Sequence, residues 1–263
     1  TLGTSGALRG IYGTGGVSTN LVIGDAALDS NGTGAFNIAI GKDALTANTI
    51  GIQNTVVGYR ALISNTTGNY NVALGLNALF SNVTGENNTA IGTAALFTNT
   101  ASGNTALGFT AFYANTTGTD GTAVGYRALT ANTTGSGNTA LGTHALSTST
   151  VANNNTAVGV RALRLTTTGY QNVAVGAFAL ENNTTGYYNV AVGIEALRDN
   201  TVAVGNVAVG AFALETNTVG ANNTAIGYDA LKVNTTGLSN VAVGTFSLRA
   251  NTTGFNNVAM GLW

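Results

Sequence analysis

Cysteine and proline are both absent from this 263-residue sequence, and charged residues make up only 7% of it. Without cysteine there is neither a disulfide framework nor a thiolate metal site, so stability has to come from other contacts. Nine basic and ten acidic residues provide no basic stripe for phosphate backbones, so we expect no nucleic-acid partner. The apolar runs are four or five residues long. A membrane helix needs roughly 20, so we also expect no membrane insertion.

Groups that carry catalysis are equally scarce. His144 is the only histidine, and neighbouring carboxylates such as Glu195 and Asp199 have no base or nucleophile beside them. The Gly-rich stretch GTGGVST at 13–19 lacks the Lys, the strand and the helix of a phosphate-binding loop. We therefore predict that the chain is not an enzyme and that it has no catalytic residue, no cofactor and no metal site.

What the sequence does contain is a short repeat. The pentapeptide NVAVG at 172–176 occurs with small variations fifteen times, for example as NVALG at 71–75 and NTAIG at 223–227. We number each repeat from the Gly of this pentapeptide, as position 0. That Gly lies at residues 24, 41, 58, 75, 92, 108, 125, 142, 159, 176, 193, 210, 227, 244 and 261. The interval is 17 residues, except for one of 16 after Gly92. A fixed short period is typical of folds whose units stack along one axis.

The residues just before position 0 indicate a buried strand. Position −1 is always aliphatic or Met, position −3 is Val, Ile, Leu or Thr, and position −2 is Ala in 13 of 15 turns. Side chains alternate faces along a strand, so this segment is apolar on both faces and should be buried on both. One face of the strand can fill the interior of the coil. We expect the other face, which contains Ala174 and Ala191, to be covered by identical chains.

The rest of the repeat predicts a short strand between two turns. Ala at +3 and Leu at +4 each recur in 13 of 14 turns, and Asn at +7, mostly within NTTG, recurs in 12. Asn and Gly suit turns because both tolerate positive φ. All charged residues except Arg9 lie at +1, +2, +5, +6, +11 or +12, which we interpret as solvated positions.

Two positions of the pentapeptide have specific structural expectations. Asn at −4, such as Asn172 and Asn189, is present in 14 of 15 turns and predicts a ladder of amides bonded from turn to turn. Gly176 and Gly193, at position 0, should lack room for a side chain or adopt positive φ.

Together these positions predict an all-β fold, a parallel β-solenoid of about fifteen 17-residue turns. The solenoid should occupy residues 20–263 and follow an N-terminal cap or connector at 1–19. Apolar residues at −3, −1 and +4 favour a flattened roll with two strands in each turn, and a triangular helix is the alternative cross-section.

The pattern N-[VT]-A-[VIL]-G resembles the head repeat of trimeric autotransporter adhesins. The longer form NTAIGYDALKVNTTG at 223–237 is similar to repeats of bacterial and phage tail-fibre-like proteins. The resemblance covers residues 20–261. It implies a left-handed β-roll, a homotrimer and a rod on a cell or virion surface. We therefore expect a structural or adhesive extracellular fibre, with a phage tail-fibre shaft or receptor-binding region as the alternative.

Two sets of residues are candidates for binding. Aromatic residues that recur at +2 and +1 would stack on sugars or on another cell-surface ligand, or would lie in subunit contacts. They are Phe178, Phe212, Phe246, Tyr59, Tyr126 and Tyr228. The Asn-Thr-Thr loops contain N-glycosylation sequons, although turn chemistry alone also explains them. These sequons include Asn65, Asn115, Asn132, Asn183, Asn234 and Asn251.

Two further hypotheses concern partners. A flat solenoid face with regular Thr would suit ice binding, although Thr at −3 alternates irregularly with Val. The last turn stops two residues past Gly261, and Thr1 with Leu2 would supply the small residue and the Leu that follow in other turns. We therefore expect the N-terminus of one chain to complete the last turn of the next in a head-to-tail filament. The alternative is that the sequence is a piece of a longer repeat protein, in which the next residues of the same chain complete the turn.

Overall fold

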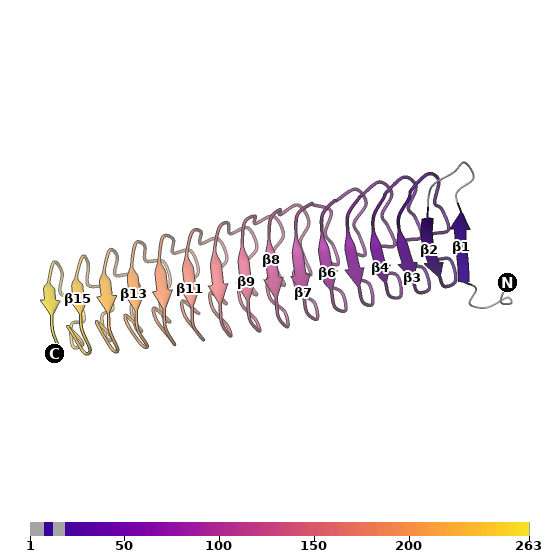
Figure 1. Ribbon diagram of the computed structural model, residues 1–263. Coiled ribbons are helices and arrows are strands. Elements are labelled where there is room, and N and C mark those ends of the chain that lie inside the picture. The colour runs from indigo at the N-terminus through magenta and orange to yellow at the C-terminus, as the bar shows by residue number, and fades with distance from the viewer. Residues whose placement is uncertain (1–7, 13–18, 263) are drawn as a thin grey trace. The chain divides into compact units, whose positions relative to one another are not determined.

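The computed structural model describes residues 8–12 and 19–262 (Figure 1). The chain divides into two units, Thr1–Thr134 and Gly135–Trp263. The strands of the first unit are β1 (Leu8–Tyr12), β2 (Thr19–Ile23), β3 (Ile38–Ile40), β4 (Thr55–Val57), β5 (Val72–Leu74), β6 (Thr89–Ile91), β7 (Thr105–Leu107) and β8 (Thr122–Val124). Those of the second are β9 (Thr139–Leu141), β10 (Thr156–Val158), β11 (Val173–Val175), β12 (Val190–Val192), β13 (Val207–Val209), β14 (Thr224–Ile226), β15 (Val241–Val243) and β16 (Val258–Met260). The described residues include no helix with the length and hydrophobicity that crossing a bilayer requires.

Within each unit, every strand pairs with the next strand along the chain. β1 is antiparallel to β2, whereas β2 to β8 are parallel. β9 to β16 are also parallel. Equivalent residues of neighbouring turns stand opposite one another, as Ala157, Ala174 and Ala191 do. The all-β parallel solenoid with turns of about 17 residues is therefore confirmed, and its left-handed sense stays a prediction.

Each 17-residue turn contains one strand, not the two that we expected. The residues at +3 and +4 lie in a tight turn because φ is positive at +2 and +4, as in Phe178 (60°) and Leu180 (51°). This alternation of the sign of φ bends the backbone too sharply for a strand. The turns still bond to one another, since the N–H of Leu180 donates to the carbonyl of Ala196 at 3.0 Å.

Leu at +4 tolerates its positive φ because its side chain is buried. Leu180 and its equivalents Leu163 and Leu197 are fully buried. The left-handed conformation costs a non-glycine residue about 1–2 kcal/mol, whereas burial of a Leu side chain contributes about 1.5–3 kcal/mol. Burial is therefore large enough to hold the turn in this conformation.

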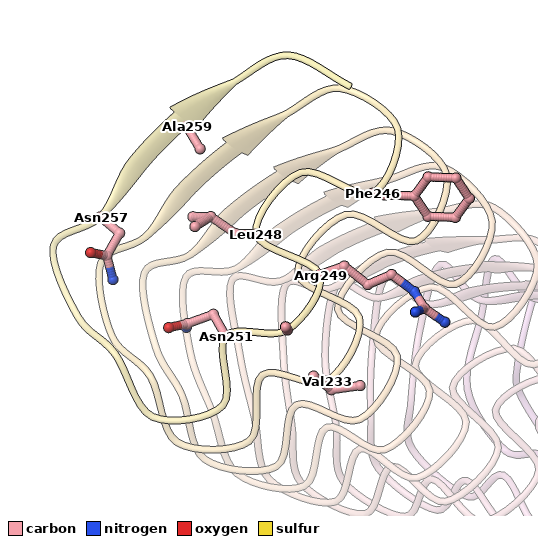
Figure 2. A pocket seen from close by; sticks show the side chains of 8 residues that line it. Val233, Phe246, Leu248, Arg249, Asn251, Asn257 and Ala259 are labelled. Atoms are coloured by element: carbon pink, nitrogen blue, oxygen red, sulfur yellow. The ribbon is translucent and has the colours of Figure 1, made fainter. Parts of the chain in front are cut away.

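The core of each unit is narrow and consists of five columns of equivalent residues. Ala at −2 and +3, Leu at +4, and Asn at −4 and +7 are buried in nearly every turn. In the last turn, Ala259, Leu248, Asn251 and Asn257 all point into the coil (Figure 2). The small residue of the strand therefore faces inward, and the residues at −3 and −1 face outward.

This orientation corrects the expected subunit contact. Ala174 and Ala191 have no exposed surface even in a single chain, because their own coil covers them. The expectation that the Ala face meets other copies is therefore wrong. Any contact through the strands has to use the larger residues at −3 and −1.

The one 16-residue repeat keeps the ladder by omitting a residue from the wide turn. Only Thr100 separates Asn99 from Ala101, where other repeats have two residues before the Gly or Ala at +10. The carbonyl of Ala101 accepts bonds from the amides of Asn88 and Asn99, both at 2.8 Å. The strand register of β6 and β7 is preserved, with Ala90 opposite Ala106.

Candidate functional site

The Asn at −4 forms a buried ladder, as the sequence predicts. The backbone N–H of Asn172 donates to Oδ1 of Asn155 at 3.0 Å, and its Nδ2 donates to the same oxygen at 3.1 Å. The same Nδ2 also donates to the carbonyl of Gly186 at 2.9 Å. Oδ1 of Asn172 accepts in turn from the backbone of Asn189 at 3.0 Å. Each Asn therefore joins its own turn to the turns on both sides.

A second ladder, which the sequence analysis treated only as turn residues, is formed by the Asn at +7. Nδ2 of Asn200 donates to Oδ1 of Asn183 at 2.8 Å, and Nδ2 of Asn183 donates to the carbonyl of Gly186 at 3.1 Å. Because the carbonyl of Gly186 also accepts from Asn172, the two ladders are linked. The sequence signal for this ladder was that Asn recurs in 12 of 14 turns. A solvated turn would also accept Asp or Ser, so a strict preference for Asn indicates that both ends of the amide group are needed.

Burial of this second ladder argues against glycans at five of the six sequons at +7, whereas Asn251 is only partly buried and its glycosylation stays a prediction. Asn65, Asn183 and Asn234 are fully buried, and their amide nitrogens donate within the ladder. Asn115 and Asn132 are likewise buried, and Nδ2 of Asn132 donates to Oδ1 of Asn115 at 3.0 Å. A glycan on any of these nitrogens would remove the hydrogen bond and find no space.

Gly176 and Gly193 are required by both space and conformation. Gly176 has φ 143° and Gly193 has φ 138°. A Cβ on Gly176 would overlap the carbonyl oxygen of Gly193, and one on Gly193 would lie 2.5 Å from the carbonyl oxygen of Gly210. The backbones of successive turns therefore approach too closely at position 0 for any side chain.

The outward face of the strands is uncharged and largely aliphatic in both units. Within residues 21–260, position −3 is Leu, Ile, Val or Thr, and position −1 is Ile, Val, Leu or Met, so neither position carries a charge. Many of these side chains are about 40% exposed, for example Leu107, Leu141 and Ile226. We call the residues at −3 and −1 the outer strand face. A face of exposed aliphatic and Thr side chains that continues without a charge through every turn of a unit is unusual for a monomer.

The six aromatic residues singled out from the sequence do not form one stripe. Phe212, Tyr228 and Phe246 lie together, with ring centroids 5.9 and 5.6 Å apart and nearly perpendicular planes. Basic groups cover the Phe rings, since Lys232 Nζ is 4.6 Å from the Phe212 centroid, and Arg249 is 5.7 Å from that of Phe246. These rings are therefore partly occupied by the protein's own cations.

The other three of these aromatic residues lie apart from this group. Phe178 lies under Arg161, at 5.8 Å from its centroid. Tyr126 stacks on Phe109 at 5.6 Å, and Tyr59 is 45% exposed. Ligand binding by the six residues stays a prediction.

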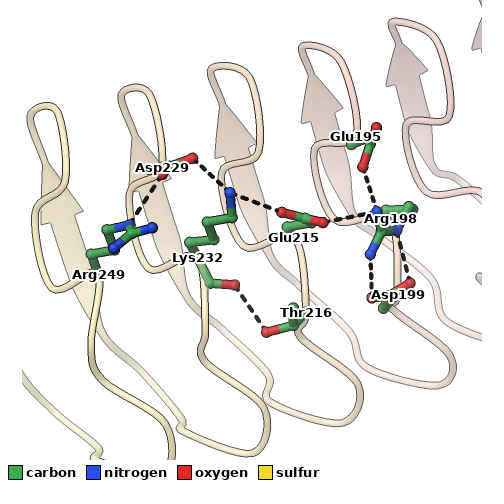
Figure 3. Close-up of polar contacts among 8 residues, drawn as sticks. All are labelled: Glu195, Arg198, Asp199, Glu215, Thr216, Asp229, Lys232 and Arg249. Carbon is green, nitrogen blue, oxygen red and sulfur yellow. Dashed lines mark hydrogen bonds and ion pairs between the residues drawn. The ribbon is translucent and has the colours of Figure 1, made fainter.

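The ten charged residues of the second unit all lie at +2, +5 or +6, on one side of the coil. We call them the charge column: Arg161, Arg164, Glu181, Glu195, Arg198, Asp199, Glu215, Asp229, Lys232 and Arg249. Five are basic and five acidic. At +5, acids alternate with bases from turn to turn through most of the column (Figure 3).

Three carboxylates of the charge column are buried, which corrects the interpretation of the charged positions as solvated. The carboxylate of Glu215 lies 2.8 Å from Arg198 and 3.3 Å from Lys232, and that of Asp229 lies 3.2 Å from Lys232 and 3.1 Å from Arg249. Glu181 lies 2.8 Å from Arg164. Bases of the same turn or of neighbouring turns replace the water that each carboxylate loses.

Neighbouring groups shift the pKa values of Arg198, Asp199 and Lys232 toward the charged forms. A hydrogen bond from Arg198 lowers the pKa of Asp199 and raises that of Arg198 itself. Burial alone would lower the pKa of Lys232, but hydrogen bonds to Asp229 and Glu215 outweigh it and raise that pKa. Glu195 also contacts Arg198, so the paired carboxylates seen in the sequence share one guanidinium. This arrangement stabilises charges and leaves them poorly suited to transfer protons.

In three successive turns of the first unit the same +5 position carries aromatic rings, whereas Asp29 occupies it in an earlier turn. Phe80 and Phe97 stack with centroids 4.9 Å apart, and Phe97 and Tyr113 stack at 5.1 Å. The guanidinium of Arg60 lies 4.8 Å from the Phe80 centroid. Each unit therefore uses this column for contacts between turns, through stacking in one and ion pairs in the other.

Three tyrosines that the sequence analysis did not select form a compact cluster in the second unit. Tyr170 and Tyr187, both at +11, stack with centroids 4.8 Å apart and planes within 4°. Tyr188, at +12, stands nearly perpendicular to both, at 5.6 Å from Tyr170 and 5.1 Å from Tyr187. We call these residues the tyrosine cluster. The sequence signal for this cluster was that Tyr170 and Tyr187 lie one repeat apart, at the same position of neighbouring turns.

A cavity of about 700 Å³ opens at the last turn of the second unit (Figure 2). It is lined mainly by Leu248, Asn251, Asn257 and Ala259, which belong to the core columns and the two Asn ladders. The cavity is therefore the coil interior at the last described turn. The residues expected to fill it, Thr1 and Leu2, lie outside the described residues, so the head-to-tail contact stays a prediction.

The single histidine and possible metal ligands were the other candidate features. His144, at +2, is partly exposed. Across residues 8–12 and 19–262, no group of three or more His, Cys, Asp or Glu side chains is placed to hold a metal ion. Comparisons with protein-family models, curated proteins and solved structures found no match.

Proposed function

We propose that this chain is a subunit of a structural or adhesive extracellular fibre, built as a homotrimer whose copies pack through their outer strand faces. The observation that carries the proposal is the outer strand face itself. It continues through all turns of each unit without a charge, and exposed aliphatic side chains such as Leu141 and Ile226 would leave water on assembly.

The size of the face supports a stable contact. With strands about 4.8 Å apart and a face about 10 Å wide, the eight strands of the second unit present roughly 400 Å². The seven parallel strands of the first unit add nearly as much. In a trimer that covers both faces of every copy, on the order of 2,000 Å² would leave water in the whole assembly, a size found for many permanent interfaces.

The rest of the molecule favours a passive, rigid role. Core residues, Asn ladders and position-0 glycines repeat in nearly every turn, so no turn is built differently around a reaction centre. The charge column is balanced, with five bases and five acids, and therefore projects little field to attract a charged substrate. The resemblance to adhesin head repeats supports three copies and a position on a cell or virion surface.

The test is the oligomeric state of a charge-carrying variant. Val175→Glu with Val192→Glu places two carboxylates on the outer strand face, where assembly would bury them. We expect light scattering to give a trimer for the unchanged chain and a monomer for this variant. Val202→Glu with Val219→Glu is the matched control, because both residues are nearly half exposed at +9, away from the strands.

Two results would contradict the proposal. One is a monomer for the unchanged chain at micromolar concentration. The other is a trimer for the Val175 and Val192 variant with an intact circular dichroism spectrum.

One observation favours a second candidate function, ice binding. Thr139 and Thr156 lie in register on the outer strand face, beside Leu141 and Val158. A flat array of hydroxyl and aliphatic groups of this kind would order water if it stayed exposed. Thermal hysteresis by a monomeric chain would support this candidate over assembly, and its absence would remove it.

A further inference from the structure

The tyrosine cluster is held rigidly by the turn-to-turn backbone bonds. The N–H of Tyr188 donates to the carbonyl of Tyr170 at 3.3 Å, and the carbonyl of Tyr187 accepts from Gly205 at 3.2 Å. Tyr188 has φ 58°, which directs its side chain differently from that of Tyr187. The perpendicular rings therefore follow from the backbone, so the cluster is preorganised for a ligand.

The surroundings of the cluster combine open space with amide groups. Tyr170 is 37% exposed and Tyr188 is 54% exposed. In the next turn, Gly205 occupies the position of Tyr188, so no side chain stands there. In the preceding turns, the amides of Gln171 and Asn154 occupy the same position and are exposed. One ring is therefore accessible beside hydrogen-bonding groups.

This edge of the second unit is also electrically neutral. All ten of its charged residues belong to the charge column at +2, +5 and +6, and none lies at +11 or +12. Partial burial, together with Tyr188 and Tyr187, raises the pKa of Tyr170, so its hydroxyl stays protonated at neutral pH. The edge offers aromatic faces, phenol hydroxyls and amides but no ion pair to a ligand.

We propose that the tyrosine cluster is a binding subsite for a neutral, β-linked polysaccharide. A pyranose ring with equatorial substituents has flat C–H faces that pack on an aromatic ring, here Tyr188, while its hydroxyls bond to Gln171 and to the phenol groups. Nucleic acid, whose bases also stack on aromatic rings, would need basic residues for its phosphates, and this edge has none. The inference names a ligand class for the proposed adhesive function and rests on it.

The test measures binding of cellohexaose and of an N-acetylglucosamine hexamer to the full chain by titration calorimetry. We expect millimolar or tighter binding, weakened about tenfold or more by Tyr188→Ala. Tyr70→Ala is the matched control, because Tyr70 also lies at +12 with positive φ (59°) and is 49% exposed, but its neighbours at +11 are not aromatic. Tyr188→Phe should retain most of the affinity, since it keeps the ring.

Light scattering on the same samples separates this inference from the proposed assembly. Loss of saccharide binding by Tyr188→Ala in a chain of unchanged oligomeric state would support the subsite. Binding of both hexamers with unchanged affinity by Tyr188→Ala, or binding of neither by the unchanged chain, would overturn it. A monomeric chain that binds saccharide through Tyr188 would contradict the assembly and leave the subsite standing.

Discussion

The side-chain amide of Asn172 donates to Oδ1 of Asn155, its equivalent one turn earlier, at 3.1 Å. Asn172→Ala removes this bond and that to Gly186, and it leaves the buried N–H of Asn189 without its acceptor. We expect a loss of about 2–4 kcal/mol in the free energy of unfolding, since buried polar groups lose their partners. Urea unfolding measures it. Thr185→Ala, at an exposed position of the wide turn, should change little, and equal losses in the two variants would show that the ladder does not stabilise the coil.

Gly176→Ala should be among the most damaging single-methyl changes. Its φ of 143° is unfavourable for Ala, and the added Cβ would overlap the carbonyl oxygen of Gly193. We expect a loss of at least about 2 kcal/mol. Gly261→Ala separates the two causes, because Gly261 has φ 142° but no atom within 4 Å of an added Cβ. If both variants were equally destabilised, conformation alone would explain the glycine.

The sequence predicts the parts of this fold in which like residues stack on like. These parts are the period, the solenoid, the Asn172 ladder and the requirement for Gly176. They can be predicted because each residue is surrounded by the equivalent residues of neighbouring turns, so the residue type at a position also describes its neighbours. The charge column is also visible in the sequence as alternating acids and bases at +5. The burial of Glu215 is not, because it depends on two bases that approach from neighbouring turns.

Which face of the strand points inward cannot be read from hydrophobicity. Both faces are apolar, and the inward choice of Ala191 over Val190 and Val192 depends on how narrow the coil is opposite Leu197. That width is set by the alternating φ values at +2 and +4, which sequence patterns predicted as a strand. The perpendicular ring of Tyr188 escaped prediction for the same reason, since it follows from a positive φ at +12.

The inward orientation changes what a charge at position −2 should do. Ala191→Glu would place a carboxylate in the core, next to buried Leu and Ala side chains, so we expect loss of the folded coil and not mere dissociation. Circular dichroism and the unfolding midpoint measure this. Val192→Glu, one residue later but outward, should keep the fold. A folded, monomeric Ala191→Glu chain would restore the Ala face as the subunit contact.

Glu215 should couple the turns of the second unit electrostatically. Glu215→Gln keeps the shape of the side chain but removes the charge between Arg198 and Lys232. We expect a loss of about 1–3 kcal/mol, because two partly buried cations lose a shared counter-ion. Glu86→Gln, in the first unit and outside the charge column, is the control. Equal effects would mean that the column contributes no more than a surface charge.

The charge column should also limit the pH range of full stability. The pKa of Asp199 is lowered from 3.8, mainly by the hydrogen bond from Arg198, so its contribution is complete above that value and is lost as pH falls through the lower folded-state pKa. The pKa of Lys232 is raised from 10.5, so its contribution is complete below that value and is lost as pH rises through the higher folded-state pKa. We therefore expect the contribution of these two groups to the free energy of unfolding to be constant between pH 3.8 and pH 10.5 and to fall on both sides.

Urea unfolding at a series of pH values measures this contribution, and Asp199→Asn should remove part of the fall on the acid side only. An acid-side profile that Asp199→Asn leaves unchanged would show that its pairing with Arg198 does not stabilise the fold.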